Sequence, residues 1–372
     1  MNPERLKQLR LAHGWSLDDL VKVMGGSVTK QSLSKYELGK SQPSPRVSEL
    51  LAHAYSLKVA ELWDSVDIDV VAYRKRAKMT QKERGRVEST LCELLRDRVY
   101  VQRLAMPDAK PAIQFHADQV QSLADAEAAA NALRARWHLG EGPLANVVET
   151  LEDHLIHVIE MDASSDFDGV SAIARDSTQE PIAGAVVSRK SVTGERQRLS
   201  LAHELGHLVM ASMGDAKQDE PLAMRFGATF LVPAQSLKQD VGTSRTVIGL
   251  AELLMLKSKW GMSIQALLYR MKDLEIISSG YFAQWFRDLG ARDWRSKEPE
   301  ALQYEKSSWL QLRTLRLLSE GAIAKENAER ILGKRLEVEL PTALLSKRNF
   351  INLPIDERRR LLAQQAAEAS NL

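Results

Sequence analysis

The sequence predicts a mainly α-helical protein with a small mixed β-sheet. Apolar residues recur at helical spacing through most of the 372 residues, and several of these segments begin at capping residues. Three short runs interrupt this pattern with strand-forming residues, at Ile156–Met161, Gly169–Arg175 and Ile182–Ser188. The chain is too long for one ordinary domain, so we expect two or three domains.

Composition indicates a globular protein of a reducing compartment. Hydrophobic residues make up 44% of the chain and charged residues 27%, with a net charge of +2. The single cysteine, Cys92, excludes an intramolecular disulfide. The first ten residues lack the apolar core of a signal peptide, and no run approaches the roughly 18–20 apolar residues of a membrane span. We therefore expect a cytoplasmic protein with no membrane partner.

The first 65 residues predict short capped helices. The segment SLDD, Ser16–Asp19, is a capping box, and Gly25 and Gly26 end that helix. A second helix is expected from near Thr29 to Gly39, and a third follows the turn SQPSPR to about Ala54.

The second of these helices has an apolar back, with Leu33 and Tyr36, and a polar front. Its polar residues are those suited to the major groove, because glutamine can pair with adenine and lysine can reach guanine. With the preceding helix and turn, the segment RLKQLRLAHGWSLDDLVKVMGGSVTKQSLSKYELGKSQPSP resembles the Cro/CI (Xre) type of helix-turn-helix.

This resemblance implies that residues 1–65 form a five-helix DNA-binding domain that acts on double-stranded operator DNA, as a homodimer. It implies that residues at the start of the second motif helix contact the DNA bases and that residues on either side of them contact the phosphates. The implied DNA-binding residues are Thr29, Lys30, Gln31, Ser34, Lys35 and Lys40. One departure weakens the expected grip: Leu17, followed by two aspartates, stands where the family often has a glutamine that touches phosphate.

Residues 66–112 predict a basic helical linker. Tyr73–Arg86 contains seven basic residues and one acid, and a stretch with two prolines follows at Ala105–Ala112. The basic stretch has two readings, a solvated helix or an arm that lies along a nucleic-acid backbone. The second reading predicts that DNA changes the activity of the rest of the chain through Arg74, Lys75, Arg76 and Lys78; equal rates with and without DNA would contradict it.

A two-histidine motif follows a helix expected from about Ala117 to His138. In RLSLAHELGHLVM, Arg198–Met210, His203 and His207 are four residues apart and share one helix face, a spacing that suits zinc. Glu204 lies about 100° round the helix and can serve as a general base at the metal.

The third ligand must come from elsewhere. Met210 and Met213 stand where the metzincin pattern needs glycine and histidine, so that class is excluded. The following helix supplies Glu220, with the small residues Ala223 and Gly227 on the same face, and Asp219 is a rival ligand.

The motif RQRLSLAHELGHLVM together with ExxAxxFGxxFLVP resembles the ImmA/IrrE family of zinc-dependent endopeptidases. The resemblance implies a zincin-like α+β peptidase domain over residues 113–275, with a gluzincin-like ligand set for Zn²⁺. In it His203, His207 and Glu220 bind the metal and Glu204 is the catalytic base. It further implies a protein substrate, a repressor whose cleavage derepresses stress, phage-defence or mobile-element genes.

The alternative is an Xre-type regulator or antitoxin-like protein whose peptidase domain is structural or weakly active. Glu204 argues against it, because a structural zinc site has no need of an acid there. We expect Ile182–Ser188 to be an edge strand that pairs with substrate. We expect His154 and His157 to be structural. Residues 276–372 predict a helical C-terminal tail to which the sequence assigns no role.

Overall fold

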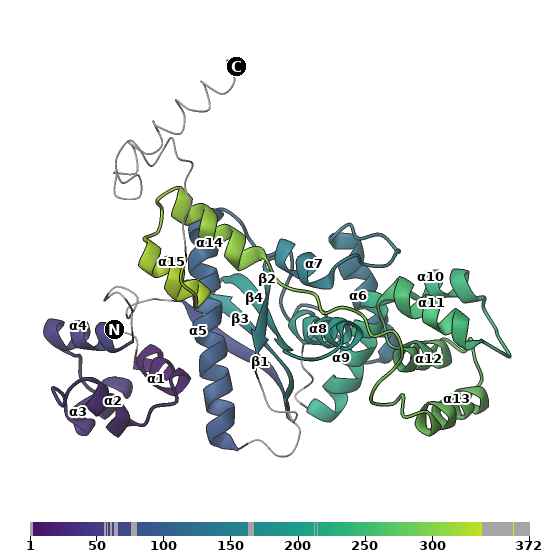
Figure 1. Ribbon diagram of the computed structural model, residues 1–372, viewed down its shortest axis with the longest axis horizontal. Helices are drawn as coiled ribbons and strands as arrows, with labels where there is room; N and C mark the ends of the chain where they lie inside the picture. Colours follow the sequence, from purple (N-terminus) through teal and green to yellow (C-terminus); the bar gives the residue numbers. More distant parts are fainter. Residues whose placement is uncertain are drawn as a thin grey trace.

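The computed structural model of the protein describes residues 3–55, 57, 59, 62, 66–75, 80–162, 167–211, 213, 215–336 and 360. Figure 1 shows a small group of N-terminal helices, then a sheet with helices on both sides, then a further group of helices at the opposite end. The described chain is mainly helical with one small mixed sheet, which confirms the expected fold class.

The N-terminal group has its helices where the capping residues predict them. They are α1 (Pro3–Ala12), α2 (Leu17–Val23), α3 (Lys30–Glu37) and α4 (Pro45–Ala54). Ser16 and Asp19 form the expected capping box, and Thr29 and Ser44 cap the next two helices. A fifth helix would fall after Tyr55, in a stretch of which much lies outside the described residues.

The sheet of the described chain has four strands in the order β1-β3-β4-β2. They are β1 (Asp67–Lys75), β2 (Ile156–Met161), β3 (Phe167–Arg175) and β4 (Pro181–Arg189). β2 pairs with β4 in parallel, and the other two pairings are antiparallel. The three expected strands are therefore present. The expected edge strand at Ile182–Ser188 is wrong, because β4 has a neighbour on each side.

The strand β1 occupies residues for which the sequence predicts a helix. Ile68 and Val70 alternate with Asp67 and Asp69, which is the period of a strand, and the two apolar residues pack into the core beneath the sheet. The charged residues that follow this short pattern favour a helix over the whole stretch when the sequence is considered alone. Helical structure begins only at α5 (Gln81–Ala105), where Thr80 and Glu83 form a capping box.

The segment expected as a linker instead covers one face of the sheet. Leu91, Leu95 and Val99 of α5 share a buried cluster with alternate residues of β2, β3 and β4. The other face packs on α8 (Gly194–Val209), so the sheet lies between two helical layers (Figure 1).

The remaining helices of the central part surround α8. They are α6 (Leu123–Arg136), α7 (Val147–Asp153), α9 (Ala216–Leu231), α10 (Ala234–Val241), α11 (Leu250–Trp260) and α12 (Ile264–Asp273). The first of them begins later than the expected start near Ala117, because Ser122 and Asp125 form a capping box and Asp118 instead bridges to Met210.

The chain after α12 returns across the molecule. It forms α13 (Ser279–Ala291), then an irregular segment, then α14 (Trp309–Ser319) and α15 (Lys325–Leu332). The irregular segment contacts the start of α8, where the backbone nitrogen of Gly194 donates to the backbone oxygen of Leu302 and Glu305 pairs with Arg198. The last two helices then share a buried cluster with Val101 of α5 (Figure 1).

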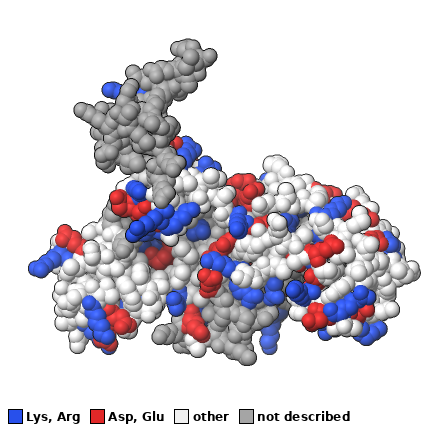
Figure 2. All heavy atoms as spheres, viewed as in Figure 1, with Lys and Arg blue, Asp and Glu red and all other residues white. Residues whose placement is uncertain are grey.

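The N-terminal helices are docked on the central part through α1 and α5. Arg5 forms an ion pair with Glu93, and Arg96 donates to Gln8 at 3.1 Å. On the face drawn in Figure 2, basic and acidic side chains are interspersed over the surface. No helix in the described part of the chain combines the length and apolarity that crossing a bilayer requires.

Candidate metal centre

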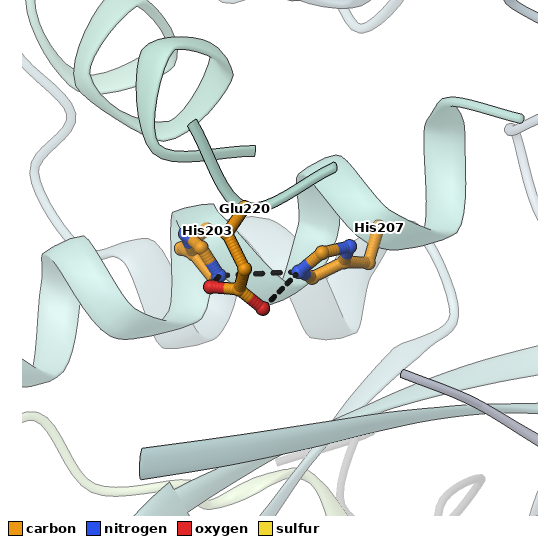
Figure 3. Close-up of side chains that lie close together, drawn as sticks. All are labelled: His203, His207 and Glu220. Carbon is orange, nitrogen blue, oxygen red and sulfur yellow. Dashed lines mark hydrogen bonds and ion pairs between the residues drawn. The ribbon is translucent and has the colours of Figure 1, made fainter. Parts of the chain in front are cut away.

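The two histidines of the motif lie on α8, one of the most buried helices of the chain. Leu201, Leu205 and Leu208 pack in the core between α8 and its neighbours. This packing leaves the face with His203 and His207 directed at α9 (Figure 3). The side chain of His203 is 1% exposed and that of His207 is 11% exposed.

Small residues bring α9 close to α8, as the sequence predicts. A Cβ atom at Gly227 would lie 2.9 Å from the backbone nitrogen of His203. At Gly206 a Cβ atom would lie 3.3 Å from the Cα atom of Ala223. The close approach positions Glu220, in the second turn of α9, opposite both imidazole rings.

The three side chains converge on one point (Figure 3). His203 Nε2 lies 3.4 Å from Glu220 Oε2, and His207 Nε2 lies 3.6 Å from Glu220 Oε1. The two Nε2 atoms are 3.1 Å apart. The described residues thus bring the three expected ligands together, with one ligand atom from each within 4.8 Å of the others.

These separations fit a tetrahedral metal. At the usual zinc–ligand distances of about 2.0–2.1 Å, neighbouring ligand atoms of a tetrahedron lie about 3.3 Å apart. The distance between the two Nε2 atoms and the distance from each of them to one of the two Glu220 oxygens lie near that value. Two imidazoles and one carboxylate form a ligand set that catalytic zinc sites use, with a fourth position left for water or substrate.

The rival carboxylate has a different partner. Asp219 Oδ1 accepts a hydrogen bond from the backbone nitrogen of Met213 at 2.9 Å, in the turn that leads into α9. It lies outside the cluster of potential metal ligands. The geometry therefore favours Glu220 as the third ligand.

The electrostatics of the cluster favour an ionised Glu220. Burial raises the pKa of this carboxyl group, but its hydrogen bonds with His203 and His207 outweigh burial and hold the pKa far below its usual range. For His207, burial lowers the pKa, but the hydrogen bond with Glu220 and the charge of Glu204 leave it raised. The carboxylate form is the one that binds a metal ion.

Glu204 is buried, with 1% exposure, and lies against β3. A Cβ atom at Gly169 would lie 2.2 Å from Glu204 Oε1, so only glycine leaves room for this carboxylate. Sequence reasoning missed the role of Gly169. The signal was a glycine within a strand, which often marks a close approach of another group.

A cavity of about 710 Å³ opens beside the metal centre, and His203 forms part of its wall. The other walls come from the same face of α8, from α9 and α12, and from residues 294–298. Sequence reasoning assigned no role to this last segment, which lies far from the motif in the chain.

The other histidine pair lies elsewhere. His157 is fully buried on β2, where its ring bonds to Gln102 at 3.0 Å and meets Trp309 edge-on. His154 stacks on Trp137 with ring centroids 4.0 Å apart. Neither ring belongs to the metal-ligand cluster, in agreement with the expected structural role.

The polar front of α3 faces solvent. Thr29, Lys30, Gln31, Lys35 and Lys40 are exposed, and Ser34 is half-buried. Lys30 forms a 2.6 Å ion pair with Asp18 of α2, so the acid noted in the sequence faces a residue expected to read bases. The side chains of Arg74 and Lys75, and all of Arg76 and Lys78, lie outside the described residues, as do many of the contacts of that basic stretch.

Comparison with known families gives two matches. Residues 6–62 match the family described as Helix-turn-helix, and residues 151–272 match the peptidase M78 family, described as the IrrE N-terminal-like domain. No curated protein matches the sequence. The second match spans α8, α9 and the cluster of His203, His207 and Glu220. The chain is therefore a fusion of an Xre-type helix-turn-helix DNA-binding domain with an ImmA/IrrE-like metallopeptidase domain.

Proposed function

We propose that this chain is a zinc-dependent endopeptidase that cleaves a repressor protein. In this proposal His203 and His207 of the HExxH motif and Glu220 of α9 hold Zn²⁺ in a gluzincin-like ligand set. The observation that carries it is that the two Nε2 atoms lie 3.1 Å apart and each meets one oxygen of Glu220, at 3.4 and 3.6 Å. Among the described residues the cluster offers three protein ligands, and a centre with three has room for a reactant, which a structural site with four does not.

Zinc, when bound, supplies a Lewis acid that acidifies water and polarises a peptide carbonyl. The remaining work falls to Glu204. Its carboxylate takes a proton from the attacking water and returns it to the leaving amide nitrogen, so that the C–N bond breaks after the new C–O bond forms. A base must be held still to do this, and burial against Gly169 restricts the side chain of Glu204.

The N-terminal domain directs the same chain to DNA. We propose that residues 1–65 bind a double-stranded operator as a homodimer, with bases read by Lys30, Gln31, Ser34 and Lys35 and phosphates bound by Thr29 and Lys40. The 2.6 Å pair with Asp18 competes for Lys30, so Asp18→Asn should tighten binding. Weaker binding of Asp18→Asn to duplexes selected by the native chain would contradict this. Cleavage of a repressor would then derepress the genes of stress, phage-defence or mobile-element functions.

The test of hydrolysis uses the full chain loaded with zinc and a library of synthetic peptides with a randomised central segment. Cleavage sites are read by mass spectrometry. Glu204→Gln should keep zinc and lose at least about 100-fold in cleavage rate, because it retains the shape of the side chain without its basicity. The matched control is Asp219→Asn, which removes a neighbouring carboxylate outside the cluster. Equal rates for the native chain and Glu204→Gln would overturn the proposal.

A second variant tests the support of the base. Gly169→Ala places a Cβ atom where the Glu204 carboxylate lies, so that the carboxylate must move. We expect zinc to stay bound and the cleavage rate to fall by about tenfold or more. Ala172→Gly, further along the same strand, serves as a control for the effect of altering β3.

A further inference from the structure

The cavity beside His203 is built by three helices that each present one face to it. Leu199 comes from α8, Met224 and Ala228 from α9, and Met262 and Ala266 from the region of α12. Its volume of about 710 Å³ is in the range of sites that enclose a large side chain or a small ligand. His203 is the one proposed metal ligand in its lining, so a group that fills the cavity lies next to that ligand.

Most charged residues of the cavity wall form ion pairs, some with residues outside the wall. Arg225 pairs with Glu127 and Asp273, each at 2.8 Å, and Arg270 pairs with the same Glu127. On the other side Lys257 binds both Glu195 and Glu298, at 2.9 and 3.1 Å. Since these charges already have partners, the apolar side chains form the part of the wall that an occupant can cover without breaking an ion pair. Arg196, Arg295 and several hydroxyl side chains line the cavity as well.

One wall comes from beyond the peptidase match, which ends at residue 272. Trp294 lines the cavity, and the segment after it is fixed by Glu298. Glu298 accepts hydrogen bonds from the backbone nitrogens of Ile264 and Gln265, at 2.8 and 3.0 Å, where they begin α12. Gln265 also donates to the backbone oxygens of Trp294 and Arg295. The tryptophan is thus held by the same contacts that cap α12.

We infer that this cavity is the specificity pocket of the enzyme and that it receives a bulky apolar side chain next to the scissile bond. Trp294 is a specificity-determining residue in this account, which gives the irregular C-terminal segment a role in substrate selection. The inference rests on the proposed function, because the cavity is placed beside the scissile bond only if the metal centre performs hydrolysis.

The test uses the same zinc-loaded chain and randomised peptide library. The native chain should prefer Phe, Leu, Met or Trp over Ala or Gly at one position beside the cleaved bond, by about tenfold or more. Ala266→Phe and Ala228→Phe fill the cavity from two different helices and should shift the preference to small residues. Trp294→Ala removes a wall and should broaden the preference among large residues. Ala291→Phe, at an exposed position of α13, should leave the preference unchanged.

A second measurement separates the pocket from the chemistry. Glu204→Gln loaded with zinc is used to retain peptides from the library, and the retained sequences are compared with those kept by the double variant Glu204→Gln, Ala266→Phe. Retention of bulky apolar sequences that the added phenylalanine abolishes supports binding of an apolar side chain in the cavity. If the native chain cleaves nothing, that result overturns the proposed hydrolysis, and with it the place of the cavity beside a scissile bond.

The outcomes that overturn the inference are distinct. Cleavage with no preference for bulky apolar residues overturns the pocket and leaves the peptidase standing. A preference that survives in both folded cavity-filling variants, with zinc content unchanged, also overturns it. If either variant fails to fold, the other and Trp294→Ala decide the matter. If the native chain shows no cleavage and the Glu204→Gln variant shows no selective retention, both proposals are overturned.

Discussion

The peptidase part contains two pairs of histidines at short spacing, and they have opposite surroundings. His203 and His207 share one face of α8, and their Nε2 atoms meet a carboxylate at 3.4 and 3.6 Å. His154 and His157 span the end of α7 and the start of β2, and each ring meets an aromatic side chain instead. Two histidines a few residues apart are therefore not enough for a metal centre.

The difference arises from the elements that carry the pairs. Four residues along a helix return to nearly the same direction, so both imidazoles face α9. A pair that crosses from a helix into a strand has no such common face. His157 is consequently directed at Gln102 of α5 and Trp309 of α14, while His154 lies on Trp137 after α6. Among the described residues, only the pair on α8 has an acidic residue beside both of its rings, Glu220 of α9.

The largest effect that we expect to distinguish the two histidine pairs is the loss of folding stability in His157→Ala. His157→Ala empties a fully buried position and leaves the Gln102 side-chain oxygen without its partner. We expect the free energy of unfolding to fall by about 3 kcal/mol, with zinc still bound at one ion per chain. Urea unfolding and metal content measure the two quantities. Loss of zinc without loss of stability would reverse the distinction between the pairs.

The next effect is a pH dependence. Burial, together with the nearby Arg98 charge, lowers the pKa of His157 to about 3, from 6.5 in an unfolded chain. Below pH 6.5 the unfolded state therefore binds a proton that the folded state does not, and stability from a neutral His157 is lost as the pH falls toward 3.

The measurement compares native chain with His157→Phe, which keeps a ring against Trp309 and cannot titrate. Both proteins are studied without metal, because metal binding at the cluster of α8 and α9 would itself depend on pH. The difference in unfolding free energy should change by about 1.4 kcal/mol per pH unit below pH 6.5, to the disadvantage of the native chain. A difference that stays constant from pH 7 to pH 5 would show that His157 is not held neutral.

The smallest effect concerns His154. Its ring stacks on Trp137 at 4.0 Å, and Nδ1 lies 2.7 Å from the backbone oxygen of Thr150, but the residue is only half-buried. His154→Ala should cost about 1 kcal/mol, with no change in zinc content. Thr150→Ser, which keeps that backbone oxygen, is a local control. If His154→Ala lowers the free energy of unfolding as much as His157→Ala does, burial does not determine which of the two substitutions is more destabilising.

The sequence allowed the grouping of the three candidate ligands to be predicted because the information for it is local. His203, Glu204 and His207 lie within two helical turns, and Ala223 and Gly227 mark the approach of the helix with Glu220. Gly169 and Trp294 could not be predicted in the same way. Each reaches the site through packing between elements distant in the chain, which no spacing within one segment encodes.

The errors in the fold have a similar origin. The strand Asp67–Lys75 has a short period-2 pattern next to a run of basic residues, and only its pairing with β3 decides its conformation. The position of β4 inside the sheet follows from its antiparallel pairing with β3 and its parallel pairing with β2, since an isolated strand pattern does not say how many neighbours a strand has.

The central claim is that Glu220, and not its neighbour, completes a zinc site with His203 and His207. Native mass spectrometry of the zinc-loaded chain measures it directly, with Glu220→Gln and Asp219→Asn as a matched pair of single-carboxylate changes. We predict one zinc per chain in the native protein and in Asp219→Asn, and loss of zinc in Glu220→Gln, because the carboxylate of Glu220 lies in the cluster with both histidines while Asp219 binds the Met213 backbone. Zinc retained in Glu220→Gln and lost in Asp219→Asn would contradict the account.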